Sequence, residues 1–153
     1  MRVLVIDDDR GYCEILLHRF QDSEHEFICC STSEELSQVD VSEFKAVIVD
    51  HTLDWAKGVD EIYRLSPMTN AVFALVSTTP PELFTVDNIV SDKIRDIFDK
   101  WEWKKVDEFL DLIPDLLFIG NRELNPSKHG TQKENKASEE KTQIQAPEEK
   151  RES

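Results

Sequence analysis

The run Ala46–Asp50 constrains the fold of this chain more than any other stretch. It reads AVIVD, so four apolar residues end in a carboxylate. A short continuous apolar run between polar residues predicts a strand that is buried on both faces of a parallel sheet. Ligands of such sheets bind just beyond the carboxyl ends of the strands, where Asp50 stands. Asp50 is therefore either a turn residue that ends the strand or part of a site.

Three further apolar runs also end in reactive side chains, which favours a site. Residues 3–6 lead into Asp7-Asp8-Asp9, residues 71–76 lead into Ser77, and residues 94–99 lead into Lys100. Another strand is predicted at 25–30. Helices are predicted between and after the strands at about 10–22, 58–65 and 81–90, a short one opens at residue 32, and the last begins near residue 102. This alternation predicts an α/β fold with a five-stranded, doubly wound parallel sheet of flavodoxin-like order 2-1-3-4-5.

Local signals set the expected ends and buried faces of the helices. Asp9 is an expected N-cap of the first helix, whose predicted apolar stripe consists of Cys13, Leu16, Leu17 and Phe20. Thr32 and Glu35 form a capping box for the second helix. In the last helix Val106, Phe109, Leu110, Ile113 and Leu117 form the stripe, Pro114 predicts a kink or a break, and Gly120-Asn121 is a stop signal.

The composition changes at residue 122. Apolar residues almost vanish there, so the segment cannot offset its ordering entropy by burial. We therefore expect one domain at residues 1–121 and a disordered, charged tail at 122–153. Residues 121–153 hold equal numbers of basic and acidic side chains, so the net charge of −14 lies in the domain. An acidic domain disfavours direct binding to nucleic acid and favours a partner with a basic face.

The compartment is also constrained by the sequence. Residues 1–3 enter a strand-like run without the features of a signal peptide, and no apolar run is long enough to cross a membrane. Cys13, Cys29 and Cys30 show no spacing typical of a metal site, so free and mostly buried thiols are expected. These features predict a cytoplasmic protein that does not bind a membrane.

The strand order places Asp7, Asp8 and Asp50 together. Three carboxylates at one edge repel one another and require a proton or a cation, and Mg²⁺ is the hard ion that oxygen ligands suit best. Ser77 and Lys100 add a hydroxyl and an ammonium to the same edge. An anion near Asp50 would meet all these groups, an arrangement suited to phosphoryl transfer with a carboxylate as nucleophile.

These pieces together resemble the receiver domain of bacterial two-component response regulators, as a stand-alone domain. The resemblance covers about residues 1–120. It depends on VLVI before Asp7-Asp8, on VIVD ending at Asp50 with Gly58 eight residues later, on LVST containing Ser77, and on Lys100 after the fifth strand. Each motif is weak by itself, but five in order at the family spacing make a specific signal.

The resemblance implies a role for each matching residue. Asp50 is the expected phosphoacceptor, and Asp7, Asp8, Asp50 and the backbone carbonyl of Thr52 are the expected Mg²⁺ ligands. Ser77 is the expected switch hydroxyl and Lys100 the lysine that contacts the phosphoryl group. The implied donor is a histidine kinase or a phosphotransfer protein, and the implied output is a downstream protein target. Such a domain catalyses only its own phosphorylation and dephosphorylation and is not a conventional enzyme.

Three positions depart from the family pattern. Trp101 follows the lysine where proline is usual, Ile97 stands where an aromatic switch residue is common, and Asp54 stands where many members have proline. Phe98 is adjacent to Ile97 but is expected to point to the other face of its strand. These departures leave the phosphorylation chemistry intact and concern the coupling to an output.

Two other functions remain open at this stage. A receiver fold kept only for binding would be an adaptor that works without phosphorylation, which the changes at Ile97 and Trp101 make credible. Asp7-x-Asp9 after a strand also resembles the nucleophile motif of haloacid-dehalogenase-type phosphatases. However, Arg10-Gly11 stands where that family has glycine-threonine, and the folded part is short for that fold.

Overall fold

The computed structural model describes residues 1–78 and 92–124, and of residues 115–124 only the helical backbone. The chain divides into two units, Met1–Ile113 and Pro114–Ser153. The helix predicted at 81–90 lies outside the described residues, and so does the tail predicted at 122–153 apart from its first three residues, which continue the last helix. Within the described residues, no helix combines the length and apolar character needed to cross a membrane.

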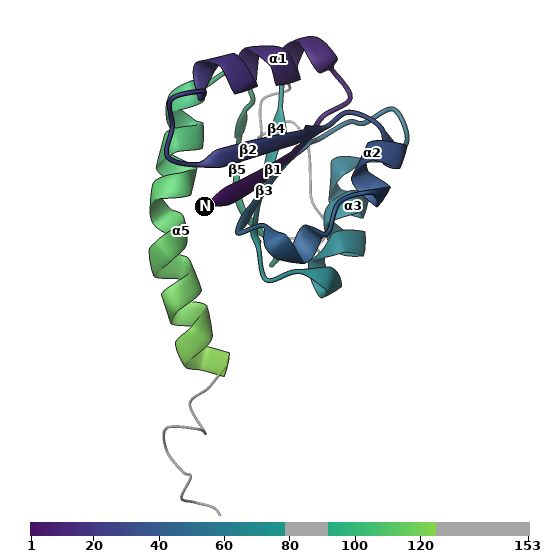
Figure 1. Cartoon of the computed structure of the whole chain (residues 1–153). Coiled ribbons are helices and arrows are strands. Elements are labelled where there is room, and N and C mark those ends of the chain that lie inside the picture. Colours follow the sequence, from purple (N-terminus) through teal and green to yellow (C-terminus); the bar gives the residue numbers. More distant parts are fainter. Residues whose placement is uncertain (79–91, 125–153) are drawn as a thin grey trace, which may run out of the picture. The chain divides into compact units, whose positions relative to one another are not determined.

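Five parallel strands form the sheet at the centre of the first unit (Figure 1). Their order is β2-β1-β3-β4-β5, so the predicted fold class is confirmed. The strands are β1 (Arg2–Ile6), β2 (Glu26–Cys30), β3 (Ala46–Asp50), β4 (Val72–Ser77) and β5 (Ile94–Asp99).

The register aligns the carboxyl ends of the strands at one edge. Ile6 pairs with Val49, Asp50 with Val76, and Ser77 with Asp99, so the predicted site residues follow neighbouring strands.

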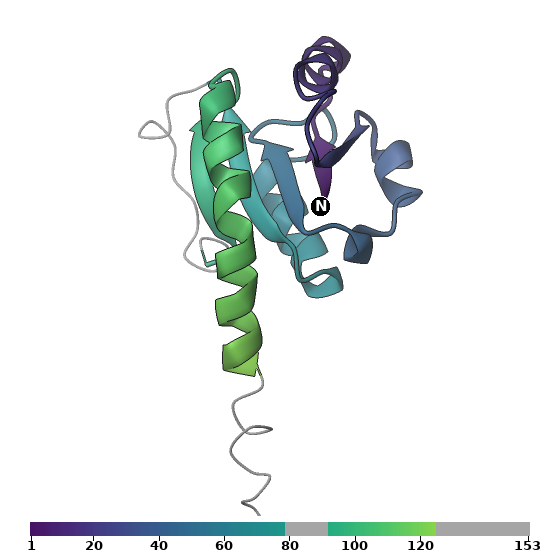
Figure 2. The ribbon, with the colours of Figure 1, turned by 60° about the vertical axis from the view of Figure 1, so that its left-hand side comes forward.

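Helices cover both faces of the sheet (Figure 2). Alternate residues of the central strands pack with Leu36 of α2 (Ser33–Ser37) and with Ile62 and Leu65 of α3 (Gly58–Leu65). The opposite face meets α1 (Arg10–Arg19) and the first turns of α5 (Trp103–Leu124), where Phe98 lies 6.4 Å from Phe109 between ring centroids. Two short 3₁₀ helices, Val41–Glu43 and Ser66–Met68, complete the described elements.

Both predicted helix caps are present. The Asp9 carboxylate accepts a hydrogen bond from the backbone N–H of Tyr12 at 3.1 Å, which fixes the start of α1. Thr32 Oγ1 accepts from the Glu35 N–H at 3.0 Å, as a capping box requires. The Glu35 carboxylate reaches back to the Ser31 N–H at 2.7 Å, one residue before the expected partner.

The first helix differs from its prediction in length and in buried face. It ends at Arg19 rather than near residue 22, with Phe20 as C-cap. Leu17 is 39% exposed, whereas Tyr12 is only 1% exposed. The buried stripe therefore includes Tyr12 with Leu16 and Phe20, spaced four residues apart, because the helix turns its Tyr12 side toward the start of α5. The prediction was wrong for Leu17.

The last helix confirms its predicted stripe but not its predicted end. Val106, Phe109, Leu110 and Ile113 are all buried, while the side chain of Leu117 is outside the described part. The helix continues through Pro114 and past Gly120-Asn121 to Leu124, so neither the break nor the stop occurs there. One proline removes a single hydrogen bond and does not have to end a helix.

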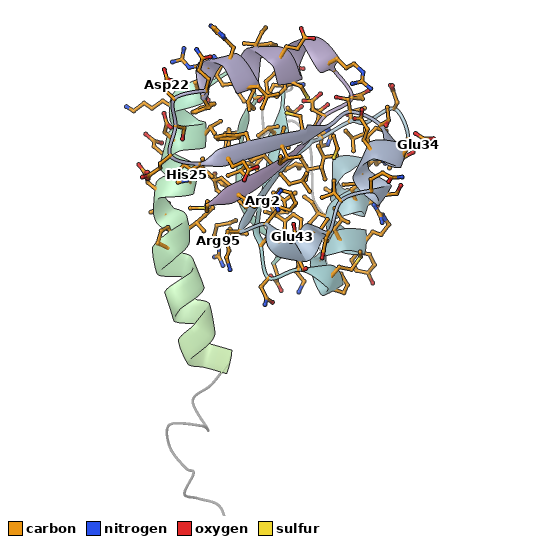
Figure 3. The ribbon with its side chains drawn as sticks, viewed as in Figure 1. Arg2, Asp22, His25, Glu34, Glu43 and Arg95 are labelled. Carbon is orange, nitrogen blue, oxygen red and sulfur yellow. The ribbon has the colours of Figure 1, made fainter. Side chains whose placement is uncertain are left out.

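The amino ends of the strands are held by a charge cluster away from the site. Arg2 at the start of β1 forms ion pairs with Glu26 of β2 and with Glu43 of the first 3₁₀ helix, and its guanidinium lies over the Phe44 ring. Arg2 and Glu43 are labelled in Figure 3. The reactive carboxylates occupy the other end of these strands.

Candidate functional site

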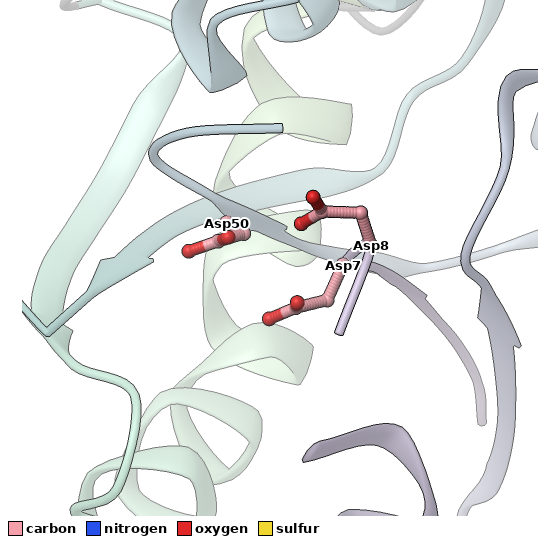
Figure 4. Close-up of side chains that lie close together, drawn as sticks. All are labelled: Asp7, Asp8 and Asp50. Carbon is pink, nitrogen blue, oxygen red and sulfur yellow. The ribbon is translucent and has the colours of Figure 1, made fainter. Parts of the chain in front are cut away.

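Three carboxylates meet at the carboxyl ends of β1 and β3 (Figure 4). Asp7 and Asp8 follow β1, Asp50 ends β3, and one ligand oxygen from each lies within 4.8 Å of the others. Asp7 is fully buried, while Asp8 and Asp50 are partly exposed. The sequence prediction that these three side chains converge is therefore confirmed by the geometry.

Lys100 brings a cation to the same place from the end of β5. Its Nζ lies 2.7 Å from Asp7 Oδ2 and 3.6 Å from Asp50 Oδ1. The side chain is only 7% exposed, so these ion pairs are poorly screened by solvent. Lys100 thus pairs most closely with Asp7 and lies within reach of an anion attached to Asp50.

Ser77 and Thr52 lie at the carboxyl ends of two neighbouring strands, β4 and β3. Ser77 ends β4, is buried, and its carbonyl accepts a hydrogen bond from the Lys100 N–H at 3.1 Å. Thr52 lies two residues beyond β3 and pairs through an isolated bridge with Lys57. Thr52 is therefore close to Asp50 in the chain, and Ser77 follows Val76, which pairs with Asp50 in the sheet.

Gly58 has a steric reason to be glycine. Its N–H donates to the His51 carbonyl at 2.8 Å, which brings the start of α3 against the end of β3. A Cβ at this position would overlap the Asp50 carbonyl oxygen and lie 2.9 Å from Leu75 Cδ1. The sequence singles out Gly58 only by its spacing from Asp50, and the structure supplies the physical cause.

Burial changes the acidity of the cluster. It raises the pKa of Asp7, and the hydrogen bond and charge of Lys100 only partly oppose this change. Burial and the Asp7 charge raise the pKa of Asp50 to about 7, again against the effect of Lys100. Without a bound cation, Asp50 therefore carries a proton for much of the time near neutral pH.

The other two charged groups respond to their neighbours. Burial acts to lower the pKa of Lys100, but its bond to Asp7 and the charge of Asp50 outweigh burial, so the ammonium stays charged. Burial raises the pKa of Asp8, and the carboxyl of Asp54, within hydrogen-bond reach, raises it further. Nothing in the order of residues indicated that Asp54 lies beside Asp8.

The donor set fits a hard divalent cation. Three carboxylates and one ammonium leave two negative charges in excess when all are ionised. Mg²⁺ is held octahedrally at about 2.1 Å by oxygen, so opposite ligands lie about 4.2 Å apart. Oxygens within 4.8 Å of one another need only small shifts to share such an ion. A bound Mg²⁺ would displace the proton from Asp50.

Comparisons with known proteins identify solved structures with a similar fold. No protein-family model matches the sequence, and no curated protein matches it either. Among solved structures, the response regulator TrrA of Thermotoga maritima, determined with Mg²⁺ and BeF, is 18% identical, with a TM-score of 0.62 over 73% of this chain and 97% of that chain.

Two further solved structures are similar in fold. A receiver domain from Methylobacillus flagellatus is 14% identical, with a TM-score of 0.63 over 74% of this chain and 98% of that chain. A structure described as adenylate cyclase from Rhodopirellula baltica is 16% identical, with a TM-score of 0.68 over 83% and 97%.

The chain has the receiver fold. The match extends over nearly the whole length of these structures, and at these identities it is a match of fold.

Within this receiver fold, the departures from the family pattern have defined positions. Ile97 packs with the core cluster on the side of α2 and α3, whereas Phe98 faces Phe109 on the other side of the sheet. The expected separation of these two side chains is confirmed. Trp101 is 43% exposed and lies edge-on to Tyr12, with ring centroids 5.1 Å apart.

Sequence reasoning missed one buried side chain at this edge. The Tyr12 hydroxyl donates to the Lys100 carbonyl at 2.9 Å, and the Lys100 Nζ lies 4.3 Å from the centroid of the Tyr12 ring. Burial raises the pKa of Tyr12, so its hydroxyl remains a donor. The spacing of Tyr12 from Leu16 and Phe20 was the available signal.

The raised pKa of Asp50 predicts a pH-dependent gain in stability for Asp50→Asn. In the unfolded chain this pKa returns to its ordinary value of 3.8, whereas in the folded chain it is about 7. The Asp50 carboxyl therefore makes its full contribution to stability below about pH 4, where it is protonated in both the folded and the unfolded chain. This contribution is lost as pH rises through about 7, because the folded chain accommodates the ionised carboxylate less well. Each pKa unit corresponds to about 1.4 kcal/mol, so we expect Asp50→Asn to be more stable than the parent by up to about 4 kcal/mol at pH 8, and little changed at pH 4.

Urea unfolding in Mg²⁺-free buffer at both pH values measures this difference. Asp22→Asn is the control, because Asp22 is exposed in the turn after α1, labelled in Figure 3. A variant that is less stable than the parent at pH 8 would show that Asp50 is not strained by its acidic neighbours.

Proposed function

We propose that this chain is a signalling receiver that accepts one phosphoryl group on Asp50 in a Mg²⁺-dependent reaction and acts through a partner protein. One observation carries the proposal. The partly exposed Asp50 carboxylate lies beside two other carboxylates and 3.6 Å from a buried ammonium. The solved structure of TrrA with Mg²⁺ and BeF, which shares the fold, supports the same assignment.

The reaction needs little from the protein beyond positioning and charge. An Asp50 carboxylate oxygen attacks the phosphorus of the donor, a P–O bond forms, and the bond from phosphorus to the donor breaks. For a histidine kinase or a phosphotransfer protein, the leaving group is an imidazole, which keeps the electron pair of the broken bond and takes a proton. The product is an acyl phosphate on Asp50.

The neighbours of Asp50 have separate roles in the proposal. Asp7, Asp8, Asp50 and the Thr52 carbonyl would hold Mg²⁺, which neutralises charge on the transferring phosphoryl group. Lys100 would form a charge-assisted hydrogen bond with a phosphoryl oxygen. Ser77 would donate its hydroxyl to another oxygen, and this contact would report the modification to the segment that follows β4.

The structure disfavours a haloacid-dehalogenase-type phosphatase. Such an enzyme would need Asp9 as a second carboxylate that takes part in the reaction. Here Asp9 caps α1 through its bond with the Tyr12 N–H. Asp7 is fully buried in an ion pair with Lys100, so it is a poor nucleophile.

An adaptor that works without phosphorylation remains the second candidate. It is favoured by Ile97, which is apolar and packs in the core, and by Trp101 after Lys100. The acidic character of the chain suits a partner protein with a basic face and disfavours nucleic acid. The adaptor and the phosphoacceptor differ in whether Asp50 is modified.

We expect acetyl phosphate with Mg²⁺ to add the mass of one phosphoryl group to the full chain. Asp50 is the acceptor, so Asp50→Asn should remain unmodified, and hydroxylamine should release the group because it cleaves acyl phosphates. Intact-mass spectrometry measures both results.

Metal removal provides the matched control for this experiment. A chelator should prevent the mass gain, and Asp8→Ala should reduce its rate by at least about a hundredfold, because the metal supplies several kcal/mol to such transfers. An unmodified parent chain under all conditions would favour the adaptor. Modification that survives Asp50→Asn would place the acceptor elsewhere.

A further inference from the structure

Tyr12 is a buried side chain that holds Lys100 at two points. It is 1% exposed, although it carries a polar hydroxyl. That hydroxyl donates to the Lys100 carbonyl at 2.9 Å, and the face of its ring lies 4.3 Å from the Lys100 Nζ. One residue of α1 therefore contacts both the backbone and the charged end of the lysine that follows β5.

The Tyr12 ring is itself fixed in place. Trp103 stacks on it at 5.6 Å between centroids and 16° between planes, and Trp101 meets it edge-on at 5.1 Å. Its backbone N–H is bound by the Asp9 cap at 3.1 Å. Aromatic pairs in these geometries are favourable beyond their buried area, so the ring is a rigid surface beneath the ammonium.

The Lys100 ammonium needs such a surface to hold its position, because its two anionic partners lie at unequal distances. Nζ is 2.7 Å from Asp7 and 3.6 Å from Asp50, so the charge alone would draw it toward Asp7. The negative face of an aromatic ring attracts a cation without offering a competing charge. Tyr12 therefore restricts where Nζ lies and leaves its remaining hydrogens available to a new anion at Asp50.

The backbone of the same turn depends on Tyr12 as well. Residues 99–103 contain no proline, so no proline ring restricts the backbone of this turn. The Lys100 N–H is bound to the Ser77 carbonyl at 3.1 Å, and the Lys100 carbonyl is bound by Tyr12. Because both peptide groups of Lys100 have partners, the side chain leaves the turn in one direction.

We propose that Tyr12 is a positioning residue of the phosphoryl site, which orients the Lys100 ammonium for the anion on Asp50. The inference depends on the proposed function, because it assigns Tyr12 a role toward that anion. It concerns the anion rather than the metal, since the hydroxyl and ring of Tyr12 contact Lys100 and the two tryptophans.

Titration of the full chain with beryllofluoride in the presence of Mg²⁺ tests the role, because this complex imitates a phosphoryl group on a carboxylate. Tyr12→Leu should weaken beryllofluoride binding about tenfold, since a desolvated ring–cation contact and one hydrogen bond are lost. Mg²⁺ affinity, measured by calorimetry without beryllofluoride, should change less than about twofold. Tyr12→Phe keeps the ring and should restore binding to within about threefold of the parent.

Phe20→Leu is the matched control. Phe20 is another buried aromatic residue of the same stripe, and its ring partners are Phe27 at 4.9 Å and Trp103 at 6.2 Å rather than Lys100. We expect this variant to bind beryllofluoride as the parent does. Equal losses in Tyr12→Leu and Phe20→Leu would show a general packing effect and would overturn the role of Tyr12.

A second substitution keeps the test sharp if Tyr12→Leu does not fold. Pentafluorophenylalanine at position 12 preserves the ring shape but reverses the charge of its face, so it should bind beryllofluoride more weakly than Tyr12→Phe. Equal affinities of these two variants would overturn the inference. A parent chain that binds Mg²⁺ but no beryllofluoride would instead contradict the proposed function, so the two failures are distinguishable.

Discussion

Gly58→Ala is expected to destabilise the fold by about 3 kcal/mol, at the upper end of what an added methyl group costs in a packed site. The new Cβ would overlap the carbonyl oxygen of Asp50 and press on Leu75 Cδ1 at 2.9 Å. The Asp50 oxygen belongs to the backbone of β3, and Leu75 is fully buried, so its methyl group has little room to turn away. To relieve the overlap, the start of α3 must move away from β3 and weaken the bond from the Gly58 N–H to the His51 carbonyl. Urea unfolding in Mg²⁺-free buffer measures the loss.

Gly11→Ala is the control for this substitution. Gly11 lies in α1, where a Cβ would approach only the Asp9 Oδ1 atom, at 3.2 Å. Alanine is also a better helix former than glycine by up to about 1 kcal/mol. The variant should therefore remain within about 1 kcal/mol of the parent. If both alanine variants were equally stable, the close approach of α3 to Asp50 would be absent in solution.

The sequence was sufficient to predict the sheet, because strands that are buried on both faces appear as continuous apolar runs. The run AVIVD of β3 contains no polar residue before Asp50, and its first four residues are all fully buried. The parallel order then followed from the alternation of strands and helices. The convergence of Asp7, Asp8 and Asp50 needed no further information, because the carboxyl ends of parallel strands share an edge.

Helix faces were predicted less well, for a physical reason. Leu17 and Tyr12 lie on opposite flanks of the α1 stripe, and hydrophobicity alone favours leucine. The choice depends on contacts made after folding, because the aromatic residues at the start of α5 pack on Tyr12. The end of α5 shows the same limit, since local signals at Pro114 and Gly120 do not determine whether a helix continues.

The distances within the site were also beyond the sequence. The residue types indicated that Lys100 would contact an anion on Asp50. The ammonium nevertheless lies 2.7 Å from Asp7 and 3.6 Å from Asp50, so it is 0.9 Å closer to Asp7. Side-chain reach and burial decide such differences, and neither can be read from the order of residues. We expect the closer ion pair, between Lys100 and Asp7, to contribute more to the stability of the fold.

Lys100→Met is expected to destabilise the chain by about 3–5 kcal/mol at pH 8, the usual cost of removing one partner of a buried ion pair. Methionine keeps much of the apolar stem, so the loss reports the missing charge. Asp7 would remain fully buried without its cation. Lys104→Met is the control, because Lys104 pairs with Glu108 at 3.9 Å and is 89% exposed. It should change stability by less than about 0.5 kcal/mol.

The pH dependence separates the charge from any packing defect in Lys100→Met. Burial already raises the pKa of Asp7, and loss of the ammonium, which acts to lower it, must raise it further. A carboxyl with a raised pKa costs no stability below its unfolded value of about 3.8, and the cost grows as pH rises toward the folded value. The deficit of Lys100→Met relative to the parent should therefore be small at about pH 4 and increase through neutral pH. Urea midpoints at closely spaced pH values would follow this increase. A deficit of the same size at every pH would mean that Lys100 stabilises the fold through its stem alone, and that Asp7 does not depend on it for charge.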